Sequence, residues 1–298
     1  MTEAARSYII GAARFEAEPL APGLYVVATP IGNMGDMTIR ALSTLAAAET
    51  VLCEDTRTSG KLMERFAIRT KLSPYHEHNA QKARPAILER LKQGATIALI
   101  SDAGMPLVSD PGYRLVKEAA EQGIPVTACP GASAVLTGLA LSGLPTDRFL
   151  FSGFVPQKAG ERKRLFEDLA KLKATLIFFE SPHRIADTLR DLETAFPGRA
   201  VAVTRELTKL HEEVLRGTAQ EIAGILGERP SVKGEITLLV GPPTEDEVVP
   251  EEDIESAIAA ALQSMPASKA ASEVARRFNL NRSDIYQRIL ALKGGDGA

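Results

Sequence analysis

The chain has few cysteines and histidines and no long apolar run. Its two cysteines, Cys53 and Cys129, are too few for a disulfide-stabilised fold, and each ends an apolar stretch, which favours a buried, reduced thiol. The four histidines show no spacing typical of a zinc site, so we predict no metal. Because no segment reaches about 18 consecutive apolar residues and no leader pattern opens the chain, we expect no transmembrane helix and a cytoplasmic protein.

Three motifs of common nucleotide-binding and hydrolytic sites are also absent. No G-x-G-x-x-G follows the first predicted strand, and no G-x-x-x-x-G-K-[ST] occurs anywhere in the chain. A G-x-S-x-G nucleophile elbow is missing as well. These absences disfavour a dinucleotide dehydrogenase and a P-loop NTPase, and they leave no sign of a serine nucleophile.

Length and periodicity predict two α/β domains. A chain of 298 residues corresponds to about two domains of roughly 150 residues each. Over residues 24–140 the predicted strands are apolar throughout and alternate with helices, which is typical of parallel strands covered on both faces, and a second α/β series begins near Phe149. For the first domain we predict strands at 23–33 (running into a turn), 49–55, 96–100 and 124–129, and helices at 36–48, 82–94, 113–122 and 133–143. For the second we predict strands at 174–181, 199–207 and 234–242, and helices at 163–173, 184–196 and 218–228.

Charge is distributed unevenly. The net charge of −3 argues weakly against a nucleic-acid partner, but 245–255 holds seven acidic residues, and 268–293 holds six Lys/Arg against two Asp/Glu. Three short helical stretches follow the acidic segment, the last capped by Asn281 or Ser283, and their spacing fits a helix-turn-helix. We therefore divide the chain into a flexible N-terminal extension (1–22), an N-terminal α/β domain (23–145), a C-terminal α/β domain (146–243), an acidic linker (244–255) and a helical, helix-turn-helix-like extension (256–298).

Turn-forming residues follow each of these first-domain strands. The loops read "TPIGNMGD", "CEDTRTSG", "SDAGMPLVSDPG" and "CPGASA". Ligands of open parallel sheets bind outside the carboxyl ends of the strands. We therefore expect a ligand crevice along this edge. In the third loop, Asp110 and Pro111 are typical of a helix N-cap and first helical residue, and predict where the next helix begins.

Eight motifs in order carry a resemblance to a known family. They are "LYVVATPIGNMGDMTIRAL", "CEDTR", "SDAGMPLVSDPG", "PGASA", "SGFVP", "FFESPHR", "RELTK" and "KGEITLLV". Over residues 23 to about 242 they resemble the tetrapyrrole methylase superfamily. "CEDTR", "YHEHN" and "RELTK" resemble its branch that methylates ribosomal RNA, and the terminal helices resemble that branch's C-terminal extension. The resemblance implies two consecutive α/β domains with the cofactor cleft between them, S-adenosyl-L-methionine as methyl donor, and a homodimer. The implied substrate is the 2′-hydroxyl of a cytidine ribose in the decoding region of 16S rRNA, within the small ribosomal subunit.

Matched motif by motif, the resemblance also implies the residues that line the cofactor. In the first domain these are Pro30, Ile31, Asp102, Met105, Ser133 and Ala134, and in the second they are Phe179, Glu206 and Thr237. Related sequences read "SDAGTP" where this chain has Met105. A polarizable apolar side chain therefore replaces a threonine hydroxyl at this position.

The sequence leaves the catalytic base open. Methyl transfer depends largely on alignment, but a ribose hydroxyl is a poor nucleophile and benefits from a proton acceptor. The catalytic candidates near the crevice are Glu54, Asp55, Arg57 and His76, with Glu206 a further possible acceptor. Arg57 has the geometry to hold a phosphate. Ion pairing that only positions loops is an equal alternative for Glu54 and Arg57, and a polar surface loop is the alternative for His76.

Two basic segments are candidates for RNA contact. They contribute Lys158, Arg162, Lys163 and Arg164, and then Arg276, Arg277, Arg282 and Arg288. The alternative is a solvated helix face, which is weakened by the polyanionic substrate that the resemblance implies. Two other functions stay open: methylation of a tetrapyrrole carbon of precorrin or uroporphyrinogen, and a non-catalytic RNA-binding assembly factor.

Overall fold

The computed structural model describes residues 6–108, 112–243, 251–278 and 280–295. It divides into two compact units, 1–242 and 243–298. The first unit contains two five-stranded sheets with their helices, and the second is helical. Within the described residues no helix is long and apolar enough to cross a bilayer.

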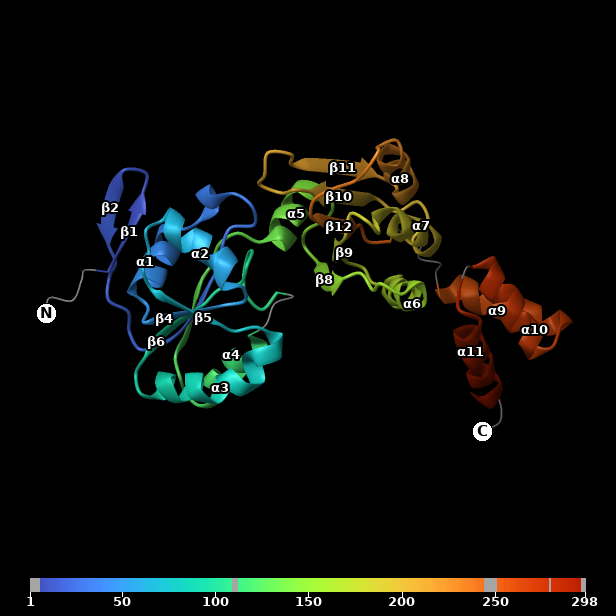
Figure 1. Cartoon of the computed structure of the whole chain (residues 1–298). Coiled ribbons are helices and arrows are strands. Elements are labelled where there is room, and N and C mark those ends of the chain that lie inside the picture. Colours follow the sequence, from blue (N-terminus) through green and yellow to red (C-terminus); the bar gives the residue numbers. More distant parts are fainter. Residues whose placement is uncertain (1–5, 109–111, 244–250, 279, 296–298) are drawn as a thin grey trace, which may run out of the picture. The chain divides into compact units, whose positions relative to one another are not determined.

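The first sheet is entirely parallel and has the strand order β5-β4-β6-β3-β7. Apolar side chains fill both of its faces, as predicted for buried parallel strands. Helices α1 and α2 cover one face and α3 and α4 the other (Figure 1). The strands are β3 (Gly23–Val27), β4 (Thr50–Cys53), β5 (Lys71–Pro74), β6 (Thr96–Leu99) and β7 (Val126–Cys129), and the helices are α1 (Ile39–Ala47), α2 (Thr56–Arg65), α3 (Glu77–Lys92) and α4 (Tyr113–Glu121).

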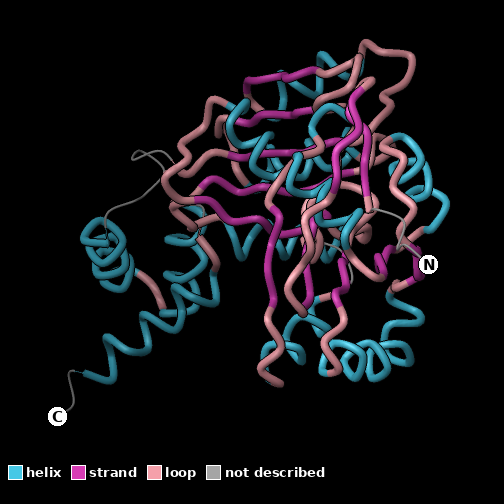
Figure 2. The backbone as a smooth tube through the Cα atoms, turned by 90° about the vertical axis from the view of Figure 1, so that its left-hand side faces the viewer, coloured by secondary structure: helices cyan, strands magenta, loops and turns pink. Residues whose placement is uncertain are grey.

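The second sheet is mixed and has the strand order β11-β10-β12-β9-β8. Only β8 and β9 run parallel; the other neighbours are antiparallel. Figure 2 shows the strands side by side with helices against them. The strands are β8 (Phe149–Phe154), β9 (Thr175–Glu180), β10 (Val201–Arg205), β11 (Glu213–Gly217) and β12 (Ile236–Val240), and α6 (Ala159–Leu169), α7 (Ile185–Ala195) and α8 (Ala219–Gly227) share one core with them.

Helix α5 (Ala134–Ser142) covers the opposite face of the second sheet. The sequence assigned this helix to the first domain, which is wrong for its packing. Val135 and Leu139 are buried against Ile177, Ala202 and Leu239 of the second sheet. Gly138 permits the close approach, since a Cβ there would stand 3.2 Å from Thr237 Cγ2. Helical periodicity predicts which face of α5 is apolar but not which sheet receives it.

The N-terminal segment is not the loose extension that we expected. Residues 6–22 contain an antiparallel hairpin of β1 (Ser7–Ile10) and β2 (Ala13–Glu16). Tyr8 is 4% exposed within the core that contains α1 and α2, and Ile9 N donates to Phe66 O at 2.8 Å. Strands of four residues are too short for a period-two pattern to be distinguished from a loop.

Several other elements differ from the prediction. Helix α2 and the strands β5, β8 and β11 were missed; α2 is mostly polar, and the three strands are partly exposed edge strands. Helix α3 begins at Glu77, earlier than predicted, and continues through Pro85. Helix α4 begins at Tyr113 after Gly112, whereas Asp110 and Pro111 lie outside the described residues. A single 3₁₀ turn, η1 (Met34–Asp36), follows the loop after β3.

The C-terminal unit is a three-helix core of α9 (Glu251–Ser264), α10 (Ala267–Arg277) and α11 (Arg282–Gly295). Its buried centre includes Ile258, Val274 and Ile289. Asn281 caps α11, because its Oδ1 accepts from Ser283 N at 2.8 Å. Helix α9 takes in 251–255, the last part of the predicted linker, and 244–250 lie outside the described residues.

Candidate active site

An apolar-walled cavity of about 420 Å³ lies at the carboxyl edge of the first sheet and reaches the second sheet. We call it the cofactor cavity, after the cofactor that the sequence resemblance implies. It contains the predicted cofactor positions Ile31, Asp102, Met105, Ser133, Ala134, Phe179 and Thr237. Its other walls are Ala103, Gly104, Val108, Val135, Phe154, Glu180, Ser181, Pro182, Leu207, Gly234, Glu235 and Ile236.

Backbone pairing shapes the first-sheet side of the cofactor cavity. Thr29 N donates to Gly104 O at 2.9 Å, and Gly104 N donates to Thr29 O at 3.0 Å, so the loops after β3 and β6 are tied together. Gly104 has φ +81°, and a Cβ there would stand 3.2 Å from Ile31 Cγ2. Only glycine meets both conditions without strain. The glycine of "SDAGMP" therefore keeps the cavity open beside Ile31.

The second-sheet side is built by paired strands and the start of α5. Thr237 of β12 and Phe179 of β9 are register partners, so both reach the same edge. The Phe179 ring packs edge-on against Phe154, with centroids 5.4 Å apart. Ser133 caps α5 by accepting from Leu136 N at 3.4 Å, which sets the first turn of the helix at the cavity wall.

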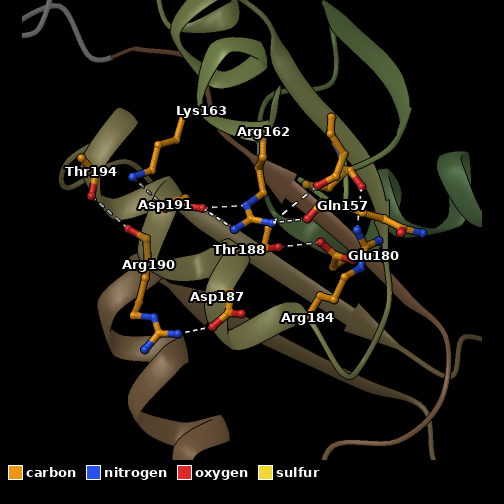
Figure 3. A network of polar contacts seen from close by, with 12 residues as sticks. Gln157, Arg162, Lys163, Glu180, Arg184, Asp187, Thr188, Arg190, Asp191 and Thr194 are labelled. Atoms are coloured by element: carbon orange, nitrogen blue, oxygen red, sulfur yellow. Dashed lines mark hydrogen bonds and ion pairs between the residues drawn. The ribbon is translucent and has the colours of Figure 1, made fainter. Parts of the chain in front are cut away.

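A buried carboxylate forms part of this wall and fixes the chain that follows β9. Glu180 is fully buried at its side chain and accepts from Ser181 N at 2.5 Å and Thr188 Oγ1 at 2.5 Å. Arg184 Nη2 lies 2.6 Å from Glu180 Oε1 (Figure 3). These contacts hold the chain reversal after β9, where Ser181 and Pro182 line the cavity. Motif matching missed Glu180, although it stands in "FFESPHR", because a position in a motif does not show which side chains face a cavity.

A second cavity of about 230 Å³ adjoins the first. The two share Ile31, Asp102, Ala103 and Glu235. The rest of the second cavity is formed by Thr29, Pro30, Gly32, Met34, Thr58, Ser59, Leu62, Ser101 and Lys209. Pro30 therefore lines the second cavity and not the first, contrary to its predicted position.

Glu206, predicted to line the cofactor, lines neither cavity. Its Oε1 accepts from Lys209 Nζ at 2.7 Å and from Glu235 N at 3.0 Å, and these bonds lower the pKa of Glu206. Lys209 Nζ also lies 2.9 Å from Glu235 Oε2. Partial burial by itself lowers the pKa of Lys209. The hydrogen bonds and ion pairs with the carboxylates of Glu206 and Glu235 outweigh this effect, so the pKa of Lys209 is raised. Glu206 thus positions a cation at the second cavity.

Asp102 is the carboxylate that both cavities share. Asp102 is exposed, but the surrounding cavity walls remove part of its hydration. This desolvation raises the pKa of Asp102, and repulsion from the Asp55 carboxylate raises it further. A hydrogen bond from Asp55 N to Asp102 Oδ1 at 3.3 Å acts in the opposite direction. The result is a carboxylate with more proton affinity than an ordinary aspartate, placed where the two cavities meet.

The four catalytic candidates from the sequence lie outside both cavities. Asp55 caps α2, accepting from Arg57 N at 2.8 Å, and forms an ion pair with the Arg57 side chain that lowers the pKa of Asp55. Arg57 is 88% exposed at its side chain, and Glu54 is exposed. His76 precedes α3, and its Nδ1 is buried without a hydrogen bond among the described residues. Their geometry fits loop and helix positioning.

The basic candidates divide by exposure. Arg162 is 6% exposed, and its guanidinium is bonded to Asp191 at 2.6 Å (Figure 3), so its placement as a surface RNA contact is wrong. The buried ion pair connects α6 to α7. Helix periodicity alone did not show that Arg162 faces inward. Lys158, Lys163, Arg164, Arg276, Arg277 and Arg282 are exposed, and Arg288 is half-buried.

Comparison with known proteins identifies relatives over nearly the whole chain. Residues 23–223 match the family described as Tetrapyrrole (Corrin/Porphyrin) Methylases, and 248–293 match the RsmI C-terminal HTH domain. The chain is 49% identical over 290 residues to ribosomal RNA small subunit methyltransferase I of Mesorhizobium japonicum, covering 97% of this chain and 98% of that one. The protein of the same name from Halalkalibacterium halodurans is 46% identical, with 88% and 93% covered. A solved uroporphyrin-III C-methyltransferase of Thermus thermophilus, complexed with S-adenosylhomocysteine, is similar at a TM-score of 0.50 and 18% identity, with 73% and 96% covered.

Proposed function

Because the chain belongs to the tetrapyrrole methylase family, we propose that it is an S-adenosyl-L-methionine-dependent methyltransferase that acts on ribosomal RNA of the small subunit. The observation that carries the substrate class is the combination of the methylase sheets with the C-terminal helical unit, over almost the full length of relatives named for that activity. More specifically, we propose that the methyl acceptor is the 2′-hydroxyl of a cytidine in the decoding region of 16S rRNA.

The cofactor cavity suits this methyl donor. Its volume of about 420 Å³ lies within the range of roughly 300–1,000 Å³ that small-molecule sites occupy. Gly104 leaves room that any side chain would fill. We assign the apolar contacts to Ile31, Met105 and Phe179 and the polar ones to Asp102 and Thr237. When bound, the cofactor supplies an activated methyl group.

The protein's contribution to the reaction is alignment and proton removal. A ribose hydroxyl loses its proton during methylation, and an acceptor within hydrogen-bond reach lowers the barrier. We assign this role to Asp102, because it borders both cavities and its pKa is raised above that of an ordinary aspartate. Thr29 and Gly104 hold the adjoining loop, so that the carboxylate stays in place.

RNA binding requires cationic surface, which the C-terminal unit provides. Arg276, Arg277 and Arg282 are exposed at the end of α10 and the start of α11. Lys158, Lys163 and Arg164 add charge near α6. Each phosphate contact releases counterions and strengthens binding at low salt. These arginines and lysines are our proposed RNA contacts.

We also propose a homodimer. Edge strand β8 exposes Phe149 (44%), Leu150 (36%) and Phe154 (60%). Apolar side chains gathered at a sheet edge are typical of a protein–protein contact. Sedimentation at micromolar concentration tests this proposal, with a monomer as the contrary result.

The decisive experiment is methylation mapping. Small subunits from cells that lack the enzyme should gain one 2′-O-methylcytidine when incubated with the protein and S-adenosyl-L-methionine. Uroporphyrinogen offered under the same conditions should stay unmodified. Active, cofactor-binding protein that leaves the subunits unmethylated would contradict the proposed function.

A further inference from the structure

The second cavity contains a polar group that the fold does not use. Ser59, on the first turns of α2, is 3% exposed and lines this cavity. Within the described residues its Oγ makes no hydrogen bond of normal geometry. It lies beside the thiol of Cys53, which is only a weak hydrogen-bond partner. A buried hydroxyl without a strong partner is costly, so its presence at a cavity points to a ligand.

The walls around Ser59 combine apolar, cationic and anionic groups. Pro30, Met34 and Leu62 supply apolar surface. Lys209 supplies a cation whose pKa is raised by Glu206 and Glu235. Asp102 closes the side that is shared with the cofactor cavity. A ligand that matches these walls has a flat apolar body and a hydrogen-bonding edge.

A single nucleotide has these properties. RNA is recognised largely through unstacked nucleotides, whose bases are held on apolar surfaces and hydrogen-bonded at their edges. The cavity volume of about 230 Å³ is below the roughly 300–1,000 Å³ of drug-sized sites, a size that suits one nucleoside. A ribose held here would lie next to Asp102 and to the cofactor cavity.

We propose that the second cavity binds the acceptor nucleoside of the RNA, and that Ser59 Oγ hydrogen-bonds to the edge of its base. The inference rests on the proposed function and adds the site and a substrate-binding residue. It has a consequence that a structural role for Ser59 would not have. Removing the hydroxyl weakens substrate binding but leaves the folded protein as stable as before, or more stable, since no strong hydrogen bond within the described residues is lost.

The test uses the full-length protein and reconstituted small subunits whose 16S rRNA carries either cytidine or an abasic ribose at the acceptor position. With cytidine, Ser59→Ala should raise KM for subunits by roughly 3- to 10-fold, the effect of one neutral hydrogen bond, with kcat within about twofold. With the abasic ribose, Ser59→Ala and wild type should have the same KM, because the partner of the hydroxyl is absent.

Ser142→Ala is the matched control. Ser142 is equally buried, at 2% exposed, but its Oγ is hydrogen-bonded to Leu139 O and Leu144 N and it lines neither cavity. This variant should lower Tm and leave KM unchanged, whereas Ser59→Ala should leave Tm unchanged or raise it. Calorimetry should give both variants the wild-type Kd for S-adenosyl-L-methionine.

Three results would overturn the inference alone: a wild-type KM for Ser59→Ala with cytidine subunits, an effect of equal size with abasic subunits, or a weakened cofactor Kd in place of a raised KM. The last result would assign the second cavity to the cofactor. Wild-type protein that does not methylate cytidine subunits would instead overturn the proposed function, and this inference with it.

Discussion

The side chain of Lys209, in the loop after β10, lies across Gly32, in the loop after β3, so that a Cβ on Gly32 would stand 2.5 Å from Lys209 Cγ. Gly32 also has φ +153°, where other residues are strained. This contact joins a first-sheet loop to a second-sheet loop at the second cavity. Its removal should therefore affect both stability and substrate binding.

Gly32→Ala should displace Lys209 from Glu206 and Glu235 and lower the free energy of unfolding by about 1–2 kcal/mol. We expect KM for small subunits to rise as well, because the cation at the second cavity moves. Urea unfolding and steady-state methylation measure the two effects. Gly160→Ala is the control, since among the described residues no atom outside its own helical turn lies within 4 Å of its Cβ position; equal effects of the two variants would contradict the prediction.

Asp102→Asn should lower kcat by roughly 10²- to 10⁴-fold, the usual contribution of a positioned proton acceptor. The wild-type rate should fall as the pH drops through the pKa of Asp102, which is raised above the ordinary aspartate value, and the variant should lack this acidic limb. Stopped-time methylation assays across pH measure both.

Asp55→Asn, at the sequence-predicted candidate, should lose much less activity, because Asp55 lies outside both cavities and asparagine also caps helices well. Exposed Asp168→Asn should match wild type. A larger loss for Asp55→Asn than for Asp102→Asn would reverse our assignment of the proton acceptor.

Met105→Thr should raise the Kd for S-adenosyl-L-methionine by roughly 2- to 5-fold, because it removes apolar surface from the cofactor cavity. Met105→Leu keeps that surface and should bind with nearly the wild-type Kd. Calorimetry compares the three proteins. Tighter binding by Met105→Thr would mean that a hydroxyl at this position contacts the cofactor.

Glu213→Gln should lower the free energy of unfolding at neutral pH. It should also reduce the amount by which that free energy falls when the pH is lowered. Arg229 bonds both Glu213 oxygens, at 2.6 and 2.8 Å, and with Arg205 it lowers the pKa of Glu213 to about 2. Because the folded-state pKa is depressed, the carboxylate stabilises the protein above its ordinary value of 4.5, and this contribution is lost as the pH falls toward about 2.

We expect a loss of about 1–2 kcal/mol at pH 7, after allowing for solvent screening of this partly exposed site. The difference between wild type and variant should disappear at low pH. Chemical unfolding at several pH values measures it, with exposed Glu228→Gln as the control. A difference that is independent of pH would exclude the ion pair as its cause.

Reversal of two charges, Arg276→Glu with Arg277→Glu, should weaken RNA binding uniformly and reduce its salt dependence. Loss of two phosphate contacts lowers the slope of log K against log salt by about 1.4, at roughly 0.7 per contact on single strands. Filter binding at several salt concentrations tests this. Exposed Arg14→Glu on the N-terminal hairpin is the control and should keep the wild-type slope.

The ligand edge was predictable because it depends on local patterns. Apolar strands followed by Gly, Pro and Asp predict loops at one edge of a parallel sheet, and Ile31, Asp102 and Met105 do meet there. What failed depends on contacts between distant segments. The residues near Arg162 in the sequence do not indicate that it pairs with Asp191, which stands 29 residues later. Likewise, only the structure shows that the Ser59 hydroxyl is buried without a hydrogen bond among the described residues.

The packing of α5 determines the order in which parts of the molecule can fold during synthesis. A ribosome that has just made residues 134–142 has made all five strands of the first sheet but none of the second-sheet surface that α5 covers. The middle strand of that surface, β12, follows about 100 residues later, which at roughly 5–20 residues per second is about 5–20 seconds of synthesis. Until β12 is made, Val135 and Leu139 lack part of their native packing, so a chain stalled in that interval exposes apolar surface of α5 to chaperones. The cofactor cavity, whose wall includes the start of α5, can form only after the second sheet is complete.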